Sequence, residues 1–160
     1  MDSDQQERQG LDERELRAWQ TFFQMQEVLR GRIEQQLQAS SGLSTADYSV
    51  LSVLSGEPGG RLRAYRLAAT LGWEKSRLHH QLTRMARRGL VERQCGDSRA
   101  IYIEITPQGL TTLAQAAPGH SRHVRELVID RLTPQQLDQL TELSAVILGP
   151  LQQNGDSSEE

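Results

Sequence analysis

Residues 61–106 constrain the fold of this chain more than any other stretch. They read RLRAYRLAATLGWEKSRLHHQLTRMARRGLVERQCGDSRAIYIEIT. The pattern predicts a short helix, a turn, a second helix with a basic outer face, and a two-stranded ribbon with Arg99 at its tip. This order of elements is typical of a winged helix-turn-helix that lies against duplex DNA.

The distribution of charge agrees with that interpretation. Ten Lys or Arg residues lie between Arg61 and Arg99, against the three acids Glu74, Glu92 and Asp97. The segment therefore carries a net charge of +7, and because the whole chain carries −3, the remainder carries −10. An acidic chain that gathers its positive charge in one segment offers one surface to a polyanion.

Length and composition indicate one domain over residues 1–160, with 36% hydrophobic residues and a single cysteine, Cys95. No apolar run approaches the ~20 residues that span a bilayer, and the start MDSDQQERQG lacks the apolar run of a signal peptide. One cysteine excludes an internal disulfide and a multi-cysteine metal site. We expect a soluble cytoplasmic protein that needs no membrane and no cofactor, with disordered polar ends at 1–10 and 154–160.

Periodicity predicts the other elements. Apolar residues at three- and four-residue steps from Leu16 to Leu37 indicate a helix over about 12–39 that ends at Gly42. Ser44 and Asp47 have the spacing of a capping box and begin a second helix. The remaining expected elements are a turn at 57–60, helices over 65–71 and 74–88, strands over 90–95 and 100–105, and helices over 107–130 and 134–150. Pro118-Gly119 is expected to kink or split the helix over 107–130.

The predicted fold class is mainly α with a small β-wing. A winged-helix lobe over 44–106 is flanked by dimerisation helices over 11–41 and 107–152. The first and last helices carry more apolar surface than a small lobe can cover, so we expect a homodimer. A two-fold dimer would present its two recognition helices about one DNA turn apart, ~34 Å.

The helix over 74–88 can be assigned face by face at ~100° per residue. Leu78, Leu82 and Met85 form a narrow apolar stripe, and residues near the helix N-terminus on the other side are expected to reach bases. The tip Arg99 would enter the minor groove, while Asp97 would either hold that guanidinium or cap the turn. A basic outer face taken alone fits a solvated helix surface equally well. The predicted DNA contacts are Arg63, Lys75, Ser76, Arg77, His79, His80, Thr83, Arg84, Arg87, Asp97 and Arg99, with Ser76, Arg77 and His80 as base readers and Arg84 and Arg87 on phosphate.

Three segments together resemble the MarR family of bacterial winged-helix transcription regulators. They are GLSTADYSVLSVL at 42–54, LAATLGWEKSRLHHQLTRMARRGLVER at 67–93, and GDSRAIYIEITPQG at 96–109. The second is similar to a recognition helix frequent in actinobacterial members. The third is similar to the family's D-x-R wing and L-T-x-x-G helix start, with Ile105 in place of Leu. The resemblance implies an intertwined homodimer on a palindromic operator, which represses transcription until a small ligand binds.

The position of the family's ligand pocket implies a second set of residues. Trp19 and Arg93 suit an aromatic or anionic metabolite by stacking and by charge. Equally, Trp19 fits a dimer core, and Arg93 fits a pair with Glu92 or a phosphate contact. The urate-sensing branch of the family places an acidic residue directly after an aromatic one in the second helix. This chain has Ser49 after Tyr48 at that place, which argues against urate as the ligand. The implied effector pocket is Trp19, Phe23, Asp47, Tyr48 and Arg93.

Other function classes are weaker. Cys95 permits a thiol redox sensor, although relatives of that type carry the cysteine in the first helix. His120 and His123 are spaced to share a metal but lack a third ligand, and the neighbours His79 and His80 point ~100° apart. A winged-helix protein-interaction module is the alternative to DNA binding. The sequence contains no nucleophile–base pair, phosphate loop or paired carboxylates, so we predict no enzyme.

Overall fold

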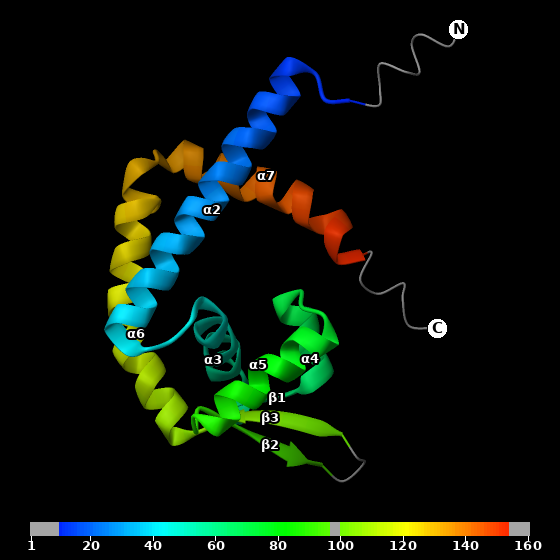
Figure 1. The fold of residues 1–160 in the computed structure, drawn as a ribbon, viewed down its shortest axis with the longest axis vertical. Helices are drawn as coiled ribbons and strands as arrows, with labels where there is room; N and C mark the ends of the chain where they lie inside the picture. The colour runs from blue at the N-terminus through cyan, green and yellow to red at the C-terminus, as the bar shows by residue number, and fades with distance from the viewer. Residues whose placement is uncertain (1–9, 97–99, 154–160) are drawn as a thin grey trace, which may run out of the picture.

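The computed structural model describes residues 10–96 and 100–153. A small lobe of helices and strands lies at one end; two long helices extend from it, and a third begins at the far end of one of them (Figure 1). The long helices are α2 (Glu13–Ser41), α6 (Pro107–Leu127) and α7 (Pro134–Gln153), with the short 3-10 turn η3 (Ile129–Arg131) before α7. The lobe contains α3 (Thr45–Gly56), η2 (Pro58–Gly60), β1 (Arg61–Arg63), α4 (Ala64–Leu71), α5 (Lys75–Arg87), β2 (Val91–Cys95) and β3 (Ile101–Ile105).

The predicted class, mainly helical with a small antiparallel wing, is confirmed, but the ribbon has three strands. The sheet order is β1-β3-β2, with both pairs antiparallel. The strand that the sequence did not reveal is β1, which pairs Leu62 with Ile103. β1 has only three residues, so its alternation of polar and apolar side chains is too short to indicate a strand in the sequence.

The corner between α2 and α3 follows the sequence signals closely. Gly42 ends α2 with φ 68°, a left-handed conformation that glycine adopts without strain. Ser44 and Asp47 then form the predicted capping box, in which each side chain accepts a backbone N–H of the other residue. The Glu34 carboxylate on α2 reaches across the corner and accepts from the backbone N–H (2.7 Å) and hydroxyl (2.6 Å) of Thr45.

One apolar core fills the lobe. It receives side chains from α3, α4, α5 and the sheet, and also from the lobe-proximal part of α2 and from α6. The buried members are Leu37, Leu43, Val50, Leu51, Leu54, Leu62, Leu67, Leu78, Leu82, Met85, Leu90, Val91, Ile103, Ile105 and Ala116.

The start of α6 is tied to the end of α5. The Thr106 hydroxyl caps α6 by accepting from the N–H of Gly109 (3.0 Å), and it donates to the carbonyl of Gly89 (2.6 Å). A Cβ at Gly109 would lie 2.2 Å from the carbonyl oxygen of Leu90. Glycine is therefore required at this position by the close approach of the two backbones.

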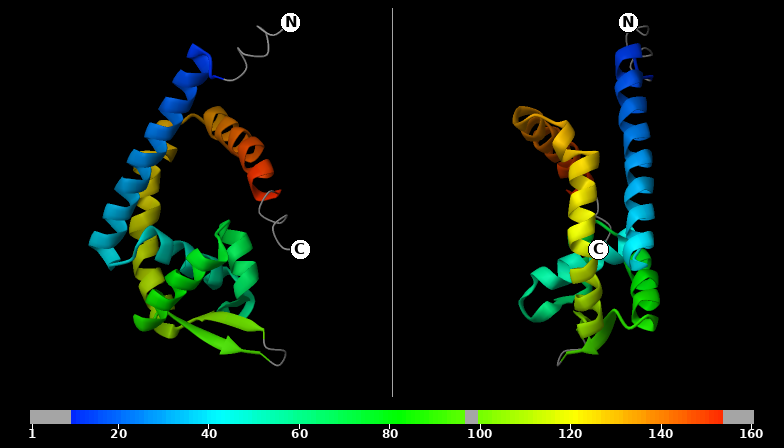
Figure 2. Two further views of the ribbon diagram at one scale, coloured as in Figure 1. Left: turned by 45° about the vertical axis from the view of Figure 1, so that its right-hand side comes forward. Right: turned by 90° about the vertical axis from the view of Figure 1, so that its left-hand side faces the viewer.

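The expected split of α6 does not occur. The helix runs unbroken from Pro107 to Leu127 with Pro118 inside it. A proline here removes the hydrogen bond to the carbonyl of Ala114, but α6 packs along α2 over this region, and both Figure 2 views show the two helices side by side. Tertiary packing therefore holds the helix together across the missing bond.

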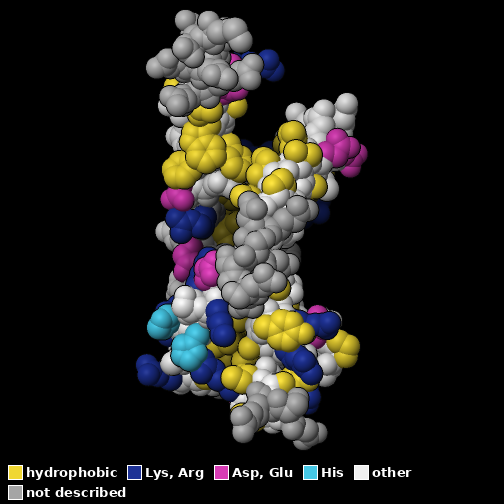
Figure 3. Space-filling view, turned by 90° about the vertical axis from the view of Figure 1, so that its right-hand side faces the viewer, with side chains coloured by type: hydrophobic (Ala, Val, Ile, Leu, Met, Phe, Trp, Pro, Cys, Tyr) yellow, Lys and Arg dark blue, Asp and Glu magenta, His cyan; other side chains and the backbone are white. Residues whose placement is uncertain are grey.

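Apolar side chains remain exposed on the helices outside the lobe. Trp19 and Phe23 on α2 are 53% and 51% exposed, and Val146 on α7 is 73% exposed. On the face seen in Figure 3, hydrophobic side chains gather over the upper part, where α2 and α7 lie. None of the described helices is both long and apolar enough to cross a membrane. The exposed apolar residues are Leu16, Trp19, Phe23, Met25 and Val28 on α2, and Leu140, Leu143, Val146, Ile147, Leu148 and Leu151 on α7.

The Glu34–Thr45 contact predicts a pH-dependent stability. Hydrogen bonds from Thr45 lower the pKa of Glu34 below its usual range, so the charged carboxylate stabilises the fold at neutral pH. That contribution is lost as the pH falls through the range in which glutamate titrates, about pH 5 to 3. Glu34→Gln should lower the free energy of unfolding by about 1 kcal/mol at pH 7, and the difference should shrink at low pH in urea titrations.

The matched control is Glu142→Gln, at an exposed position on α7. It should leave the unfolding free energy within about 0.5 kcal/mol of the wild type at either pH. A Glu34→Gln deficit that is the same at low and neutral pH would contradict the role of the charge.

Candidate nucleic-acid interface

The helix α5 divides into a buried side and an exposed side, as the sequence predicted. Leu78, Leu82 and Met85 are at most 3% exposed and anchor the helix in the core. On the other side, the polar and basic side chains point to solvent, with Thr83 half-buried among them. The exposed set on α5 is Lys75, Ser76, Arg77, His79, His80, Arg84 and Arg87.

The N-terminal end of α5 carries a supported arginine. The guanidinium of Arg77 lies over the ring of Trp73, 4.3 Å from its centroid. Trp73 is half-buried in the short connection between α4 and α5, so its ring is held in place. A cation over an aromatic face loses little conformational freedom when it later binds a ligand. Trp73 was not among the predicted site residues, although its place four residues before Arg77 was a signal in the sequence.

A second arginine braces the same helix from the sheet. Arg93 on β2 donates to the backbone carbonyl of His79 (3.1 Å) and to the hydroxyl of Thr83 (3.0 Å). Arg93 therefore neither pairs with Glu92 nor lies with the other implied effector residues. The hydroxyl of Thr83 is engaged on both sides, because it also donates to the His79 carbonyl (2.9 Å).

The exposed face of the sheet holds a separate cluster of cations. Strand alternation turns Leu62 toward the helices and its neighbours Arg61 and Arg63 to the opposite face. There Arg61 lies over the ring of Tyr102 (4.6 Å to the centroid), and Arg63 donates to the Tyr102 hydroxyl (3.1 Å). The hydrogen bond from Arg63 lowers the pKa of the Tyr102 phenol, and the positive charge adds to the shift. Arg63 is thus on the other face of the sheet from α5.

The base of the wing is closed by a short contact. The N–H of Gly96 donates to the carbonyl of Ala100 at 2.8 Å. A Cβ on Gly96 would lie 2.9 Å from the Tyr102 ring, so glycine leaves room for that ring. Asp97 and Arg99, which the sequence assigns to the wing tip, lie outside the described residues.

The implied effector residues are not brought together within one chain. Trp19 and Phe23 stack on each other on the exposed part of α2, with ring centroids 5.8 Å apart. Asp47 is 2% exposed, and its carboxylate is occupied by partners inside the lobe. Tyr48 lies instead against His120 on α6, with ring centroids 4.3 Å apart. Their assignment to one effector pocket stays a prediction from the position of the family's pocket.

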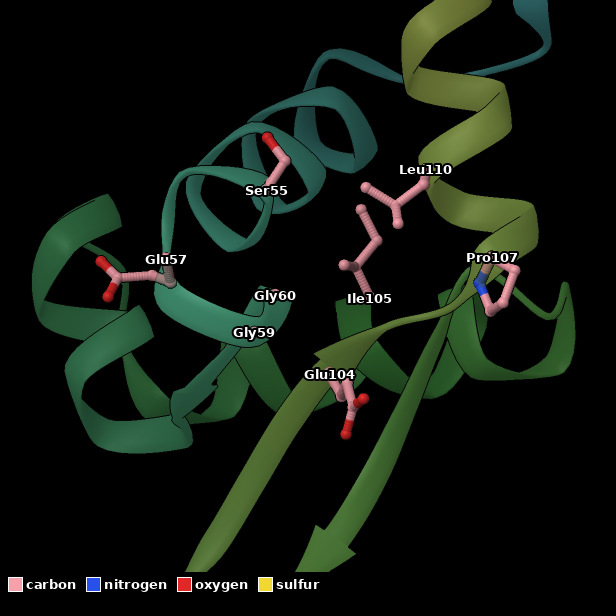
Figure 4. A pocket seen from close by; sticks show the side chains of 8 residues that line it. All are labelled: Ser55, Glu57, Gly59, Gly60, Glu104, Ile105, Pro107 and Leu110. Atoms are coloured by element: carbon pink, nitrogen blue, oxygen red, sulfur yellow. The ribbon is translucent and has the colours of Figure 1, made fainter.

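Two hollows on the surface of the described residues contain none of the implied effector residues. The first, of about 460 Å³, lies beside the start of α6 and the end of α3 (Figure 4). The second, of about 420 Å³, lies against α2. The first is lined by Ser55, Glu57, Gly59, Gly60, Glu104, Ile105, Pro107 and Leu110, and the second by Gln26, Glu27, Leu29, Arg30, Ile33 and Thr45.

The four histidines lie on α5 and α6, and the one cysteine lies at the end of β2. Residues 10–96 and 100–153 contain no group of three His, Cys, Asp or Glu side chains placed to hold a metal ion. His79 and His80 meet edge to face with centroids 5.8 Å apart. His123 lies 4.0 Å from Glu126, and Cys95 is exposed at the end of β2.

These features define a winged helix: a helical lobe with a three-stranded antiparallel wing and an outward-facing basic helix. A model of the MarR family matches residues 41–100. Sco3205 from Streptomyces coelicolor, a MarR family transcriptional regulator solved in complex with DNA, is 32% identical with a TM-score of 0.86, and the match covers 89% of this chain and 94% of that one. AbsC, a MarR family regulator from the same organism, is 36% identical with a TM-score of 0.85 and coverage of 89% and 97%.

A mutant of MarR from E. coli, complexed with operator DNA, shares the fold at 19% identity with a TM-score of 0.72, over 81% of this chain and 91% of that one. No curated protein matches the chain. The identity and coverage of the two Streptomyces proteins place this chain in the MarR family, and it is a transcriptional regulator of that family.

The Arg63–Tyr102 contact predicts a shifted tyrosine titration. Because Arg63 stabilises the phenolate, Arg63→Gln should raise the pKa of Tyr102 toward its ordinary value. The measurement is the ultraviolet absorbance of tyrosinate against pH, and Tyr102→Phe identifies the component that belongs to this residue. Arg66→Gln, at an exposed arginine on α4, is the matched control and should leave the curve unchanged. If Arg63→Gln also left it unchanged, the contact would not exist in solution.

Proposed function

We propose that this protein is a homodimeric repressor that binds a palindromic double-stranded DNA site and leaves it when a small molecule binds. It acts by binding and not by catalysis. The observation that carries the proposal is the exposed basic side of α5, held outward by the burial of its apolar stripe in the lobe. The complex of Sco3205 with DNA supports the same assignment.

The contacts with DNA divide by their place on α5 and the wing. Ser76, Arg77 and His80, near the helix N-terminus, read base edges in the major groove. Arg84 and Arg87 lie further along and bind backbone phosphates, where each contact adds salt-dependent affinity without sequence preference. Arg99 at the wing tip enters the adjacent minor groove. Lys75, His79, Thr83, Asp97 and Arg63 complete the proposed interface.

The exposed apolar surface supports the dimer. Trp19, Phe23 and Val28 on α2 stand in water in a single chain, as do Leu143 and Val146 on α7. Contiguous apolar surface of this kind marks an interaction site. A second copy would cover both helices, and two-fold symmetry would match a palindromic site. In solution, we therefore expect the molecular mass of the protein to be twice that of one chain.

A second place, where α2, α3 and α6 meet, supports an effector site. Tyr48 and His120 lie ring against ring there, and Gln36 of α2 lies beside Gly119. Buried polar atoms of Gln36, His120 and His123 have no hydrogen-bond partner among the described residues. Buried polar atoms are normally paired, so this corner offers acceptors or donors to a small polar or aromatic ligand.

Two substitutions on α5 separate base reading from phosphate binding. Arg77→Ala should weaken binding to a selected operator by about 1–3 kcal/mol and relax preference at one base position. Arg87→Ala should weaken operator and random DNA alike and lower the slope of log affinity against log salt by about one unit. Both affinities are measured by fluorescence anisotropy over a salt series.

Equal losses of affinity from both variants on random DNA would contradict the division into base-reading and phosphate-binding residues. If the wild type preferred no DNA fragment, sequence-specific DNA recognition would be refuted.

A ligand for the corner is expected to stabilise the protein and release DNA. In a thermal-unfolding screen of aromatic and anionic metabolites, a true effector at 100 times its Kd contributes about 2.7 kcal/mol to stability. The same compound should dissociate the operator complex. His120→Gln should abolish both effects at that concentration, whereas a compound that acts equally on the variant binds elsewhere.

A further inference from the structure

A buried carboxylate links the cap of α3 to the recognition helix α5. The Asp47 side chain accepts three hydrogen bonds: from the Ser44 N–H (2.9 Å), from Gln81 Nε2 (2.6 Å) and from Arg88 Nη1 (2.7 Å). Capping α3 requires only the first of these. The other two hold α5, and a carboxylate this deeply buried depends on them, because an unpaired buried charge is costly.

Gln81 continues the connection to the exposed side of α5. Its side chain is 4% exposed, and it donates to Asp47 while its amide oxygen accepts from Arg84 Nη2. A carboxylate can only accept and a guanidinium can only donate, so one orientation of the amide satisfies both partners. Gln81 therefore joins a fixed acceptor in the core to a cation at the surface.

Arg88 ties the C-terminal end of α5 to the same corner. Its Nη1 atom donates to Asp47, and its Nη2 atom donates to the carbonyl of Gly42 at 2.8 Å. Gly42 is the residue that ends α2. The end of α2, the cap of α3 and the end of α5 thus meet at the Asp47–Arg88 pair.

We propose that Asp47 and Gln81 are positioning residues for DNA binding, with Asp47 fixing the Gln81 amide and that amide holding the Arg84 guanidinium ready for a backbone phosphate. This inference rests on the proposed function. An arginine has five N–H donors and spends one on Gln81, which leaves the others for phosphate. A side chain that is already held loses less rotamer entropy on binding than a free one.

A double-mutant cycle of operator affinities distinguishes the proposed positioning role of Gln81 from a purely structural one. The four proteins are the wild type, Gln81→Met, Arg84→Ala and the double variant, each as the full chain, with operator affinity measured at a temperature where circular dichroism shows it folded. Gln81→Met keeps the side-chain length but cannot hydrogen-bond. It should weaken binding roughly 3- to 10-fold when Arg84 is present, the cost of ordering one long side chain, and less than about 2-fold when Arg84 is absent.

An equal fold-loss in both backgrounds would overturn the proposal, because Gln81 would then act on the whole helix and not through Arg84. Gln81→Asn is the second variant if methionine prevents folding. Its amide is too short to reach both partners, so the same non-additive pattern is expected. Gln115→Met, at an exposed position on α6, is the matched control and should leave affinity unchanged.

The outcomes separate this inference from the proposed function. If the wild type selects an operator and Arg84→Ala weakens it while the cycle is additive, only the positioning role fails. If Arg84→Ala has no effect on affinity, the positioning role also fails, since there is no contact to prepare. If the wild type binds no DNA fragment at all, the proposed function fails, and the positioning role fails with it.

Discussion

The burial of one narrow stripe of α5 determines what the rest of the molecule can do. Leu78, Leu82 and Met85 lie in the core against side chains from α3 and the sheet. At ~100° per residue, fixing these three positions also fixes where every other side chain of the helix points. Removing apolar surface from water stabilises the stripe, and the basic side is exposed as a consequence. A change of register at this stripe would therefore alter the presented surface more than the loss of any one cation.

The exposed basic side is not a set of freely moving side chains. Arg77 rests on Trp73, Arg84 is bound by Gln81, and the middle of the helix is braced by Arg93 from β2. These supports come from three different parts of the lobe. Isolated surface cations contribute little to binding affinity, because water and salt screen their charges and their side chains must be ordered on binding. In the proposed DNA complex, this prior support would lower the cost of ordering the side chains, which would link the geometry of the lobe to DNA affinity.

Most of the architecture follows from local sequence signals, and the exceptions have physical causes. The capping box of Ser44 and Asp47 and the stop at Gly42 are set by residues within a few positions of each other, which is why they were predicted correctly. Long-range contacts are not encoded in this way. The pairing of β1 with β3 and the Asp47–Gln81 bond join residues that only the folded chain brings together. Accordingly, the sequence did not reveal that Gln81 and Arg88 donate to the carboxylate of Asp47.

The same buried carboxylate suggests how the helices outside the lobe are coupled to α5. Asp47 receives Arg88 from the end of α5, and Arg88 also holds the carbonyl of Gly42 where α2 ends. Beyond that corner, α2 carries the exposed Trp19 and Phe23 that are proposed to enter the dimer. Any tilt of α2 relative to the lobe must stretch the Arg88 contacts or move α5 with them. Because packed interiors deform little, we expect α5 to move with α2, so a tilt of α2 would change the direction in which α5 presents its basic side.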